Sequence, residues 1–362
     1  MKLSNKMIPV AAGIALAVGA LSVQAADSIT VVSWGGAYTK SQVEAYHKPW
    51  IAATGNQIKS EDYNGGIAEI KAQVEAGNVS WDVIDVELSD AIRACDEGLL
   101  EEMDHSSLPA APDGTAATDD FLPGTLYDCA VASIVWSTIF AYDKEKMADG
   151  PTTIADFFDT EKFPGKRGLR KNPKANLEMA LMADGVAAGD VYDVLGTDEG
   201  VDRAFAKLDS IKSEVVWWEA GAQPPQLLAD GEVAITTAYN GRIFNAVADE
   251  NKDFEIVWDG QVYDLDLWVV PKGSPNKEAA MDFVAFSTAT EQLAAQASYI
   301  SYGPARKSSG PLVGKFHNKD IDMGPQMPTA EVNLTNALQN DFEFWADNQD
   351  QLSERFNAWL AK

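Results

Sequence analysis

A strand–helix pattern that recurs about every 25 residues is the feature that most constrains the fold of this chain. Short runs rich in β-branched residues lie at 28–33, 56–60 and 81–86, and each is followed by a helical pattern. Strands that alternate with helices of this length form a parallel sheet covered by helices. The pattern therefore predicts an α/β fold.

An apolar run at 129–142 indicates how more than one α/β unit could be joined. The run is nearly all apolar and is long for a single strand of one sheet. A strand of this length can leave one sheet and enter another, and 362 residues are enough for two domains. We interpret the run as the first crossing between two lobes.

The segment from Gly231 to Asp266 combines a cation and two acids near predicted strand ends. An apolar strand at 233–238 ends at a turn where a helical pattern begins, and this turn carries Arg242. A short strand at 254–257 follows, and then a strand in which Asp264 and Asp266 alternate with apolar residues. Together these side chains suggest a pocket that recognises both ends of a small charged molecule.

Two further strand ends carry candidate ligand-binding side chains. The first strand runs into Trp34 and Tyr38, and the third strand ends at Glu87. Ligands of open α/β sheets bind at the carboxyl ends of the strands, which favours a role at the site for these residues. The alternative for Trp34, a core aromatic, remains open at this point.

The first 25 residues have the pattern of a secretory signal peptide. Lys2 and Lys6 precede an apolar run at 8–23, and Val23-Gln24-Ala25 resembles a signal peptidase site. An uncleaved anchor is the alternative, but the apolar run is short for spanning a membrane. We therefore expect residues 1–25 to be removed on export.

The chain is strongly acidic, with a formal net charge of −27 that becomes −29 when Lys2 and Lys6 are removed with the signal. Such a surface repels nucleic acid and anionic lipid, so neither is an expected partner. It could attract a cationic solute. The simpler interpretation, which we favour, is a solvated acidic surface.

The positions of the cysteines and histidines, and the absence of common catalytic motifs, favour a binding protein without a metal or cofactor. Cys95 and Cys129 lie outside any Cys-x-x-Cys motif in an exported chain, which predicts one structural disulfide between them. The three histidines are widely spaced, so a zinc site is not expected. A nucleophile elbow, a P-loop and a His-Glu-x-x-His motif are all absent from the sequence. An enzyme remains the alternative from another functional class.

Several segments together resemble the periplasmic solute-binding proteins of ABC importers. They are SITVVSWGGAY, WDVIDV, GEVAITTAYNGR, DLDLWVVPKGSPNKEAAMDFVAF and SYGPA. The resemblance is to the spermidine/putrescine-binding branch and its γ-aminobutyrate-binding relatives, and it covers essentially the whole mature chain. It implies a two-lobed periplasmic binding protein fold (type II), with crossing strands between the lobes and the ligand in the cleft. On this pattern lobe 1 comprises 26–136 plus 264–310, lobe 2 comprises 137–263, and C-terminal helices at 311–362 pack across the lobes.

The resemblance carries individual residues over. The polyamine binders place aromatic side chains where Trp34 and Tyr239 stand, and a carboxylate where Asp266 stands. Asp264 occupies a position where those proteins have a tryptophan. Glu87 adds an acid where they tend to have a hydroxyl.

Two departures from the polyamine pattern change the ligand that we expect. The positions of an amine-clamping pair of acids fall on Asn172 and Ala175, and Arg242 would repel a second ammonium. An arginine instead offers a fork for a carboxylate or sulfonate. The γ-aminobutyrate-binding relatives are expected to use an arginine and an aspartate in this way.

We therefore expect an ω-amino acid such as γ-aminobutyrate, or a similar zwitterion, as the ligand. Asp266 with Glu87 or Asp264 would bind the ammonium, and Arg242 would bind the acid. Trp34 and Tyr239, which the resemblance places beside the ligand, would pack against the alkyl linker between its two charged groups. A polyamine remains the alternative within the class, and an interlobe salt bridge is the alternative role of Arg242.

The remaining expectations concern partners and the cleft rim. The resemblance implies capture by lobe closure in the periplasm, followed by docking on the membrane permease of an ABC importer. We expect a monomer. Tyr299 and Tyr302 precede a Gly-Pro turn that this family often brings to the cleft; one of them should line the site, and we favour Tyr302.

Overall fold

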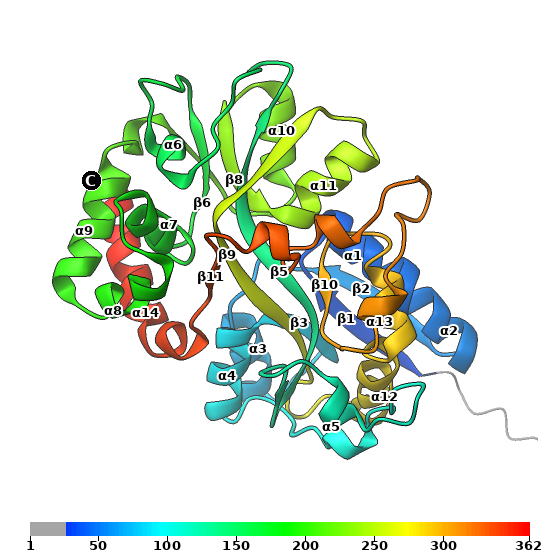
Figure 1. The fold of residues 1–362 in the computed structure, drawn as a ribbon. Coiled ribbons are helices and arrows are strands. Elements are labelled where there is room, and N and C mark those ends of the chain that lie inside the picture. Colours follow the sequence, from blue (N-terminus) through cyan, green and yellow to red (C-terminus); the bar gives the residue numbers. More distant parts are fainter. Residues whose placement is uncertain (1–26) are drawn as a thin grey trace, which may run out of the picture.

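The computed structural model describes residues 27–362, which form two α/β lobes connected through an 11-stranded mixed sheet (Figure 1). The predicted signal peptide lies outside the described residues. The strands are β1 (Ser28–Ser33), β2 (Gln57–Asp62), β3 (Val83–Glu87), β4 (Leu126–Tyr127), β5 (Ala130–Asp143), β6 (Arg167–Arg170), β7 (Val215–Trp218), β8 (Ile235–Tyr239), β9 (Phe254–Val269), β10 (Gly303–Pro304) and β11 (Leu338–Gln339).

Helices cover both ends of this sheet (Figure 1). They are α1 (Gly36–Gln42), α2 (Lys48–Thr54), α3 (Ala68–Glu75), α4 (Leu88–Asp96), α5 (Ala117–Asp120), α6 (Ile154–Phe158), α7 (Asn176–Ala183), α8 (Val191–Leu195), α9 (Asp198–Asp209), α10 (Gln223–Asp230), α11 (Asn240–Ala248), α12 (Lys277–Ser287), α13 (Thr290–Gln296) and α14 (Phe342–Leu360). A π-helical turn, η1 (Val43–His47), connects α1 to α2. None of the helices within 27–362 is long and apolar enough to cross a membrane.

The first lobe is built on the parallel strands β2, β1 and β3, as the strand–helix pattern predicts. Its core contains Trp50, Trp268 and Phe283, and both tryptophan rings lie 5.6 Å from the ring of Phe283. The second lobe is built on β8, β6 and β7, with a separate core that includes Phe140 and Phe157. The α/β prediction is therefore confirmed, while the residue limits expected for the lobes remain a prediction.

Two long antiparallel strands, β5 and β9, connect the lobes. Their ladder extends from the pair Val131–Trp268 in the first lobe to the pair Asp143–Phe254 in the second. Every residue of β5 is buried, which explains why its sequence is mostly apolar. The predicted crossing at 129–142 corresponds to this strand.

The prediction of two separate strands between 254 and 268 is wrong, because β9 is continuous. Asp259-Gly260 has the sequence of a turn, and Gly260 has a positive φ of 75°. However, the Gly260 N–H donates to the carbonyl of Asn336 at 2.9 Å, and the residues on both sides pair with β5. Tertiary pairing thus outweighs the local turn signal.

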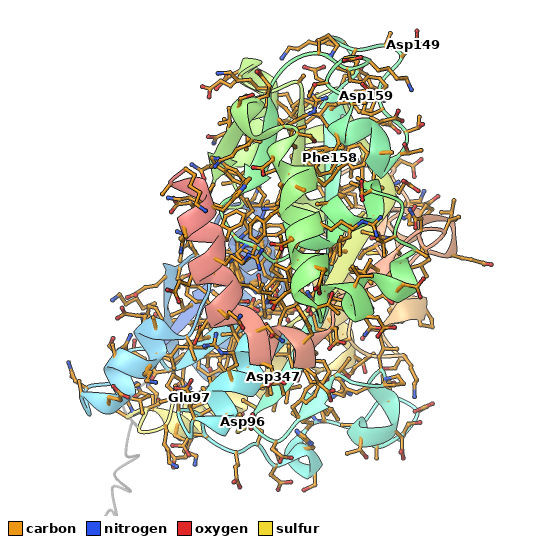
Figure 2. All side chains as sticks on the ribbon, turned by 90° about the vertical axis from the view of Figure 1, so that its left-hand side faces the viewer. Asp96, Glu97, Asp149, Phe158, Asp159 and Asp347 are labelled. Atoms are coloured by element: carbon orange, nitrogen blue, oxygen red, sulfur yellow. A yellow bond between two sulfur atoms is a disulfide. The ribbon has the colours of Figure 1, made fainter. Side chains whose placement is uncertain are left out.

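The C-terminal part is less helical than expected. Only α14 is a long helix, and the segment before it contains short 3₁₀ turns such as Glu331–Asn333. Gln261 of β9 donates to the carbonyl of Asn333 at 2.6 Å, which fixes this segment over the crossing strands. Figure 2 shows α14 beside α9, where Phe356 packs against Phe205 of the second lobe.

The predicted disulfide between Cys95 and Cys129 is confirmed. It connects the last turn of α4 to the residue just before β5, with a sequence separation of 34. In the chain-entropy model, closing a loop of this length stabilises a protein by roughly 3–4 kcal/mol. The bond lies within the first lobe, so it leaves the two lobes free to move relative to each other.

Candidate ligand-binding site

A cavity of about 220 Å³ lies between the lobes, where β3, β5, β8 and β9 meet the first turns of α1 and α11. Seven of the eight residues expected at the site line it, together with one that was not expected. The lining residues are Trp34, Tyr38, Glu87, Trp136, Tyr239, Arg242, Asp266 and Tyr302. Their role in binding remains a prediction, but the fold brings them to one place.

Aromatic side chains form most of the cavity wall. Tyr239 meets Trp136 edge-on at a centroid distance of 5.0 Å, and Tyr38 meets Tyr302 edge-on at 5.2 Å. These rings bury much apolar surface and leave little freedom for rotamer change. They give the cavity apolar walls of the kind against which an alkyl chain can pack. Of the two candidate tyrosines, Tyr302 lines the cavity, whereas Tyr299 stacks on His317 at 4.6 Å.

Glycines make room for two of the lining side chains. Gly65 has a φ of +86°, and any Cβ at this position would collide with the ring of Trp34. Gly36 has a φ of +58°, and a Cβ there would lie 2.8 Å from Nη1 of Arg242. The positive φ favours glycine at both positions, and the close approach requires it.

Asp266 is the buried carboxylate of the cavity. It is 4% exposed, and its Oδ1 has no hydrogen-bond partner among residues 27–362. Burial raises the pKa of Asp266 well above its ordinary value, and the nearby Asp85 and Glu87 raise it further. A buried carboxylate without a partner is costly, so a ligand ammonium at this position would be strongly favoured.

Arg242 faces the cavity from the opposite lobe. It is 3% exposed, and its Nη1 and Nη2 donate to the carbonyls of Gly35 and Trp34 at 2.5 and 3.1 Å. Its Nε has no partner within the described part of the chain. Arg242 therefore joins the lobes through backbone carbonyls rather than through the salt bridge considered as its alternative role. Its two hydrogen bonds use two of the five N–H groups of the guanidinium, so Nε–H and one N–H on each terminal nitrogen remain for a ligand.

Glu87 lines the cavity, but both of its oxygens are already paired. Oε1 accepts from Arg170 at 2.9 Å and Oε2 from Lys174 at 2.7 Å. Burial alone would raise the pKa of Glu87, but Lys174 and Arg170 outweigh it and lower the pKa to about 2. Glu87 is therefore a poor acceptor for a ligand ammonium, unlike the role considered for it from the sequence.

Asp264 is the one expected site residue that does not line this cavity. It lies in a neighbouring space of about 350 Å³ with Thr138, Lys174 and Asn340. Its Oδ1 accepts from the backbone N–H of Leu265 at 2.7 Å, and its Oδ2 has no partner within 27–362. Burial raises the pKa of Asp264 to about 7, an effect that Lys174 opposes.

Sequence reasoning missed three residues of this region. Trp136 lies within the apolar run of β5, where a tryptophan is most simply interpreted as core. Arg170 ends β6, so the rule that ligands bind at strand ends could have identified it. Lys174 lies in the loop before α7, the loop that carries Asn172 and Ala175, and it had no local signal of its own. None of the residues that the structure describes forms a cluster of acids, histidines and cysteines suited to a metal ion.

Comparison with known proteins identifies the family. The model of the family described as bacterial extracellular solute-binding protein matches residues 43–329. The chain belongs to this family. Its members bind solutes, so the prediction of a binding protein rather than a secreted enzyme is confirmed.

Individual relatives agree with this assignment. The chain is 46% identical over 347 residues to a γ-aminobutyric acid-binding protein of Pseudomonas aeruginosa, with 96% of this chain and 95% of the relative covered. It is 24% identical to a putrescine/cadaverine-binding protein of the same organism, with 82% and 85% covered. A solved structure described as a GABA receptor is 34% identical and superposes with a TM-score of 0.78, covering 93% of this chain and 98% of that one.

Proposed function

We propose that this solute-binding protein captures a short ω-amino acid of the γ-aminobutyrate type for an ABC importer. Asp266 binds the ammonium, the Nε of Arg242 binds the carboxylate, and the rings of Trp34 and Tyr239 pack against the linker. The observation that carries the proposal is the placement, across one cavity, of a buried carboxylate and a buried guanidinium, whose Oδ1 and Nε respectively have no partner among residues 27–362. The 46% identity to a γ-aminobutyric acid-binding protein supports it.

The distribution of charge around the cavity supports a zwitterion. The opposite charges lie on different lobes. Asp266 lies opposite Glu87 in the β3–β9 ladder of the first lobe, whereas Arg242 belongs to α11 of the second. A zwitterion therefore matches the charges on the two sides of the cavity.

A polyamine is the second candidate, and the charge balance around the cavity favours it. Five buried carboxylates gather there with only three cations; they are Asp85, Glu87, Asp90, Asp264 and Asp266, against Arg170, Lys174 and Arg242. Excess acid attracts a cationic ligand. However, burial raises the pKa of Asp85 and of Asp264 to about 7 in each case, so part of this charge is neutralised by protons.

Calorimetric titration of the mature protein with γ-aminobutyrate, n-butylamine and 1,4-diaminobutane distinguishes the two candidates. Wild type should bind γ-aminobutyrate most tightly. In Arg242→Met this preference over n-butylamine should fall by roughly 100-fold, because a buried charge-assisted contact is lost. Asp266→Asn should weaken the binding of both γ-aminobutyrate and n-butylamine.

Arg203→Met is the matched control, because Arg203 lies on the surface and pairs with Asp184. It should leave the titrations unchanged. If wild type bound the diamine more tightly than γ-aminobutyrate, the zwitterion proposal would be refuted and a polyamine would be the ligand class. An unaltered ligand preference in Arg242→Met would refute the role of Arg242.

The location and the docking partner form part of the same proposal. The chain belongs to a bacterial extracellular family, and we place it in the periplasm, where its closed form would dock on the membrane permease of the importer. Fractionation of cells that express the full chain tests the location. Release with the periplasmic fraction at a mass lacking residues 1–25 is the expected result.

A further inference from the structure

Glu87, Arg170 and Lys174 form a buried ion triad across the cleft, and neither of its cations is needed to bind a zwitterion. Glu87 ends β3 in the first lobe, whereas in the second lobe Arg170 ends β6 and Lys174 lies in the loop that follows. The side chains of Glu87 and Lys174 are 5% and 4% exposed. Lys174 also donates to Ser89 Oγ at 2.6 Å.

The triad determines how many free carboxylates face the ligand. Glu87 and Asp266 are partners on adjacent strands, so their side chains project from neighbouring positions into the same cavity. Arg170 and Lys174 occupy both oxygens of Glu87, while Oδ1 of Asp266 has no partner in the described part of the chain. Without the two cations, the cavity would present two free carboxylates side by side.

Arg170 also places its charge beside two of the aromatic side chains that line the cavity. The carbon of its guanidinium lies 5.7 Å from the ring centroid of Trp34 and 5.7 Å from that of Tyr239. A fixed positive charge thus borders both aromatic walls against which a ligand chain would lie. A second ammonium on that chain would meet this charge in a desolvated setting, where like charges repel strongly.

We propose that Arg170 and Lys174 are specificity-determining residues that restrict the site to ligands with a single ammonium group. They do so by neutralising Glu87, which leaves Asp266 as the one acid available to the ligand, and by repelling a second cation. This inference deepens the proposed function and rests on its assignment of the ammonium to Asp266. It assigns a role to two residues that do not themselves need to touch the ligand.

The test measures the affinity ratio of n-butylamine to 1,4-diaminobutane, two probes that lack a carboxylate. In the double variant Arg170→Gln/Lys174→Met, both oxygens of Glu87 become free, and the ratio should shift toward the diamine by at least tenfold. A shift of less than tenfold in the folded variant overturns the proposal. Should the double variant not fold, Lys174→Met alone, which frees Oε2, is judged by the same threshold.

Two further variants separate this effect from a general change of charge. Lys171→Met with Arg203→Gln removes the same two charges from exposed positions, since Lys171 pairs with Glu219 on the surface. This control should leave the ratio at the wild-type value. Adding Glu87→Gln to the double variant should abolish the gain, and a gain that persists there overturns the role of Glu87.

The amine–diamine affinity ratio does not depend on which acid group the natural ligand carries. Failure of wild type to bind γ-aminobutyrate would refute the proposed function, yet the amine–diamine ratio would still be measurable. Conversely, normal γ-aminobutyrate binding with an unshifted ratio in the double variant would refute only the role of the triad.

Discussion

Asp264 and Asp266 lie two residues apart on β9, yet their surroundings differ. Asp266 faces the ligand cavity beside Trp136, whereas Asp264 faces the neighbouring space with Asn340. Burial raises the pKa of both carboxyl groups. A ligand ammonium can compensate the charge of Asp266, but Asp264 has no such role in the proposed complex. Ionisation of Asp264 therefore remains a cost to the folded protein.

This difference predicts a pH-dependent effect of Asp264→Asn. The carboxyl has a pKa near 4 in the unfolded chain and of about 7 in the folded protein, so the folded state holds the extra proton between these values. The stability of wild type should thus fall as pH rises from about 4 to about 7. Asp264→Asn removes this loss, and its advantage in free energy of unfolding should grow by roughly 1–2 kcal/mol between pH 5.5 and pH 8.

Urea unfolding at the two pH values measures the effect of Asp264→Asn. The charges that face Asp264, namely Lys174, Glu87 and Asp90, are unchanged in the variant. Asp149 is an exposed residue labelled in Figure 2; Asp149→Asn is the control and should show no pH-dependent gain. An advantage of Asp264→Asn that is the same at both pH values would contradict the assignment of a raised pKa.

At the scale of elements, the loop between β7 and α10 supports the site from behind. Gly221 of this loop lies so close to two cavity-lining residues that a Cβ there would be 2.9 Å from the ring of Tyr239 and 3.1 Å from Nε of Arg242. Trp218, at the end of β7, packs edge-on against the same tyrosine at 5.5 Å. Its neighbour Trp217 points to the opposite face and packs against Phe356 of α14.

Gly221→Ala should therefore weaken binding of γ-aminobutyrate by roughly tenfold, because overpacking of about 1–3 kcal/mol would displace Tyr239 and Arg242. Gly189→Ala is the matched control, since a Cβ at Gly189 meets nothing within 4 Å. Titration calorimetry and a thermal melt of both variants provide the measurement. Equal affinities of the two variants would show that the loop does not position the site.

Local patterns predicted most of the elements and part of the site. The turn from β8 into α11, which carries Tyr239 and Arg242, follows from an apolar run that ends in a helical pattern. The continuity of β9 could not be predicted, because it depends on pairing with β5 and on the contact of Gly260 with Asn336. The neutralisation of Glu87 could not be predicted either, because it also depends on contacts that are distant in the sequence. Its partners are more than 80 residues away in the sequence, at 83 and 87 positions.

At the scale of the whole molecule, the contacts across the cleft link ligand binding to closure. Arg242 bonds to Trp34 and Gly35, and Glu87 bonds to Arg170 and Lys174, so each set joins the two lobes. Opening the cleft must break both sets, while the β5–β9 ladder keeps the lobes connected. A ligand that bridges Asp266 and Arg242 adds a third link and shifts the population toward the closed form.

We therefore expect γ-aminobutyrate to reduce the radius of gyration measured by small-angle X-ray scattering. A ligand with a single charged group, such as n-butylamine or butyrate, can bind the charged residue of only one lobe. It should therefore cause little contraction even at saturating concentration. Arg242→Met should not contract with any of the three. Equal contraction with n-butylamine and γ-aminobutyrate would show that closure does not require the carboxylate.

The disulfide has a practical consequence for measuring this motion in real time. The chain contains two cysteines, and the bond between Cys95 and Cys129 uses both. The oxidised protein therefore offers no thiol to a maleimide dye, and one engineered surface cysteine on each lobe could be labelled without background. A fluorescent sensor for the solute could thus be built on the natural sequence without first removing reactive residues.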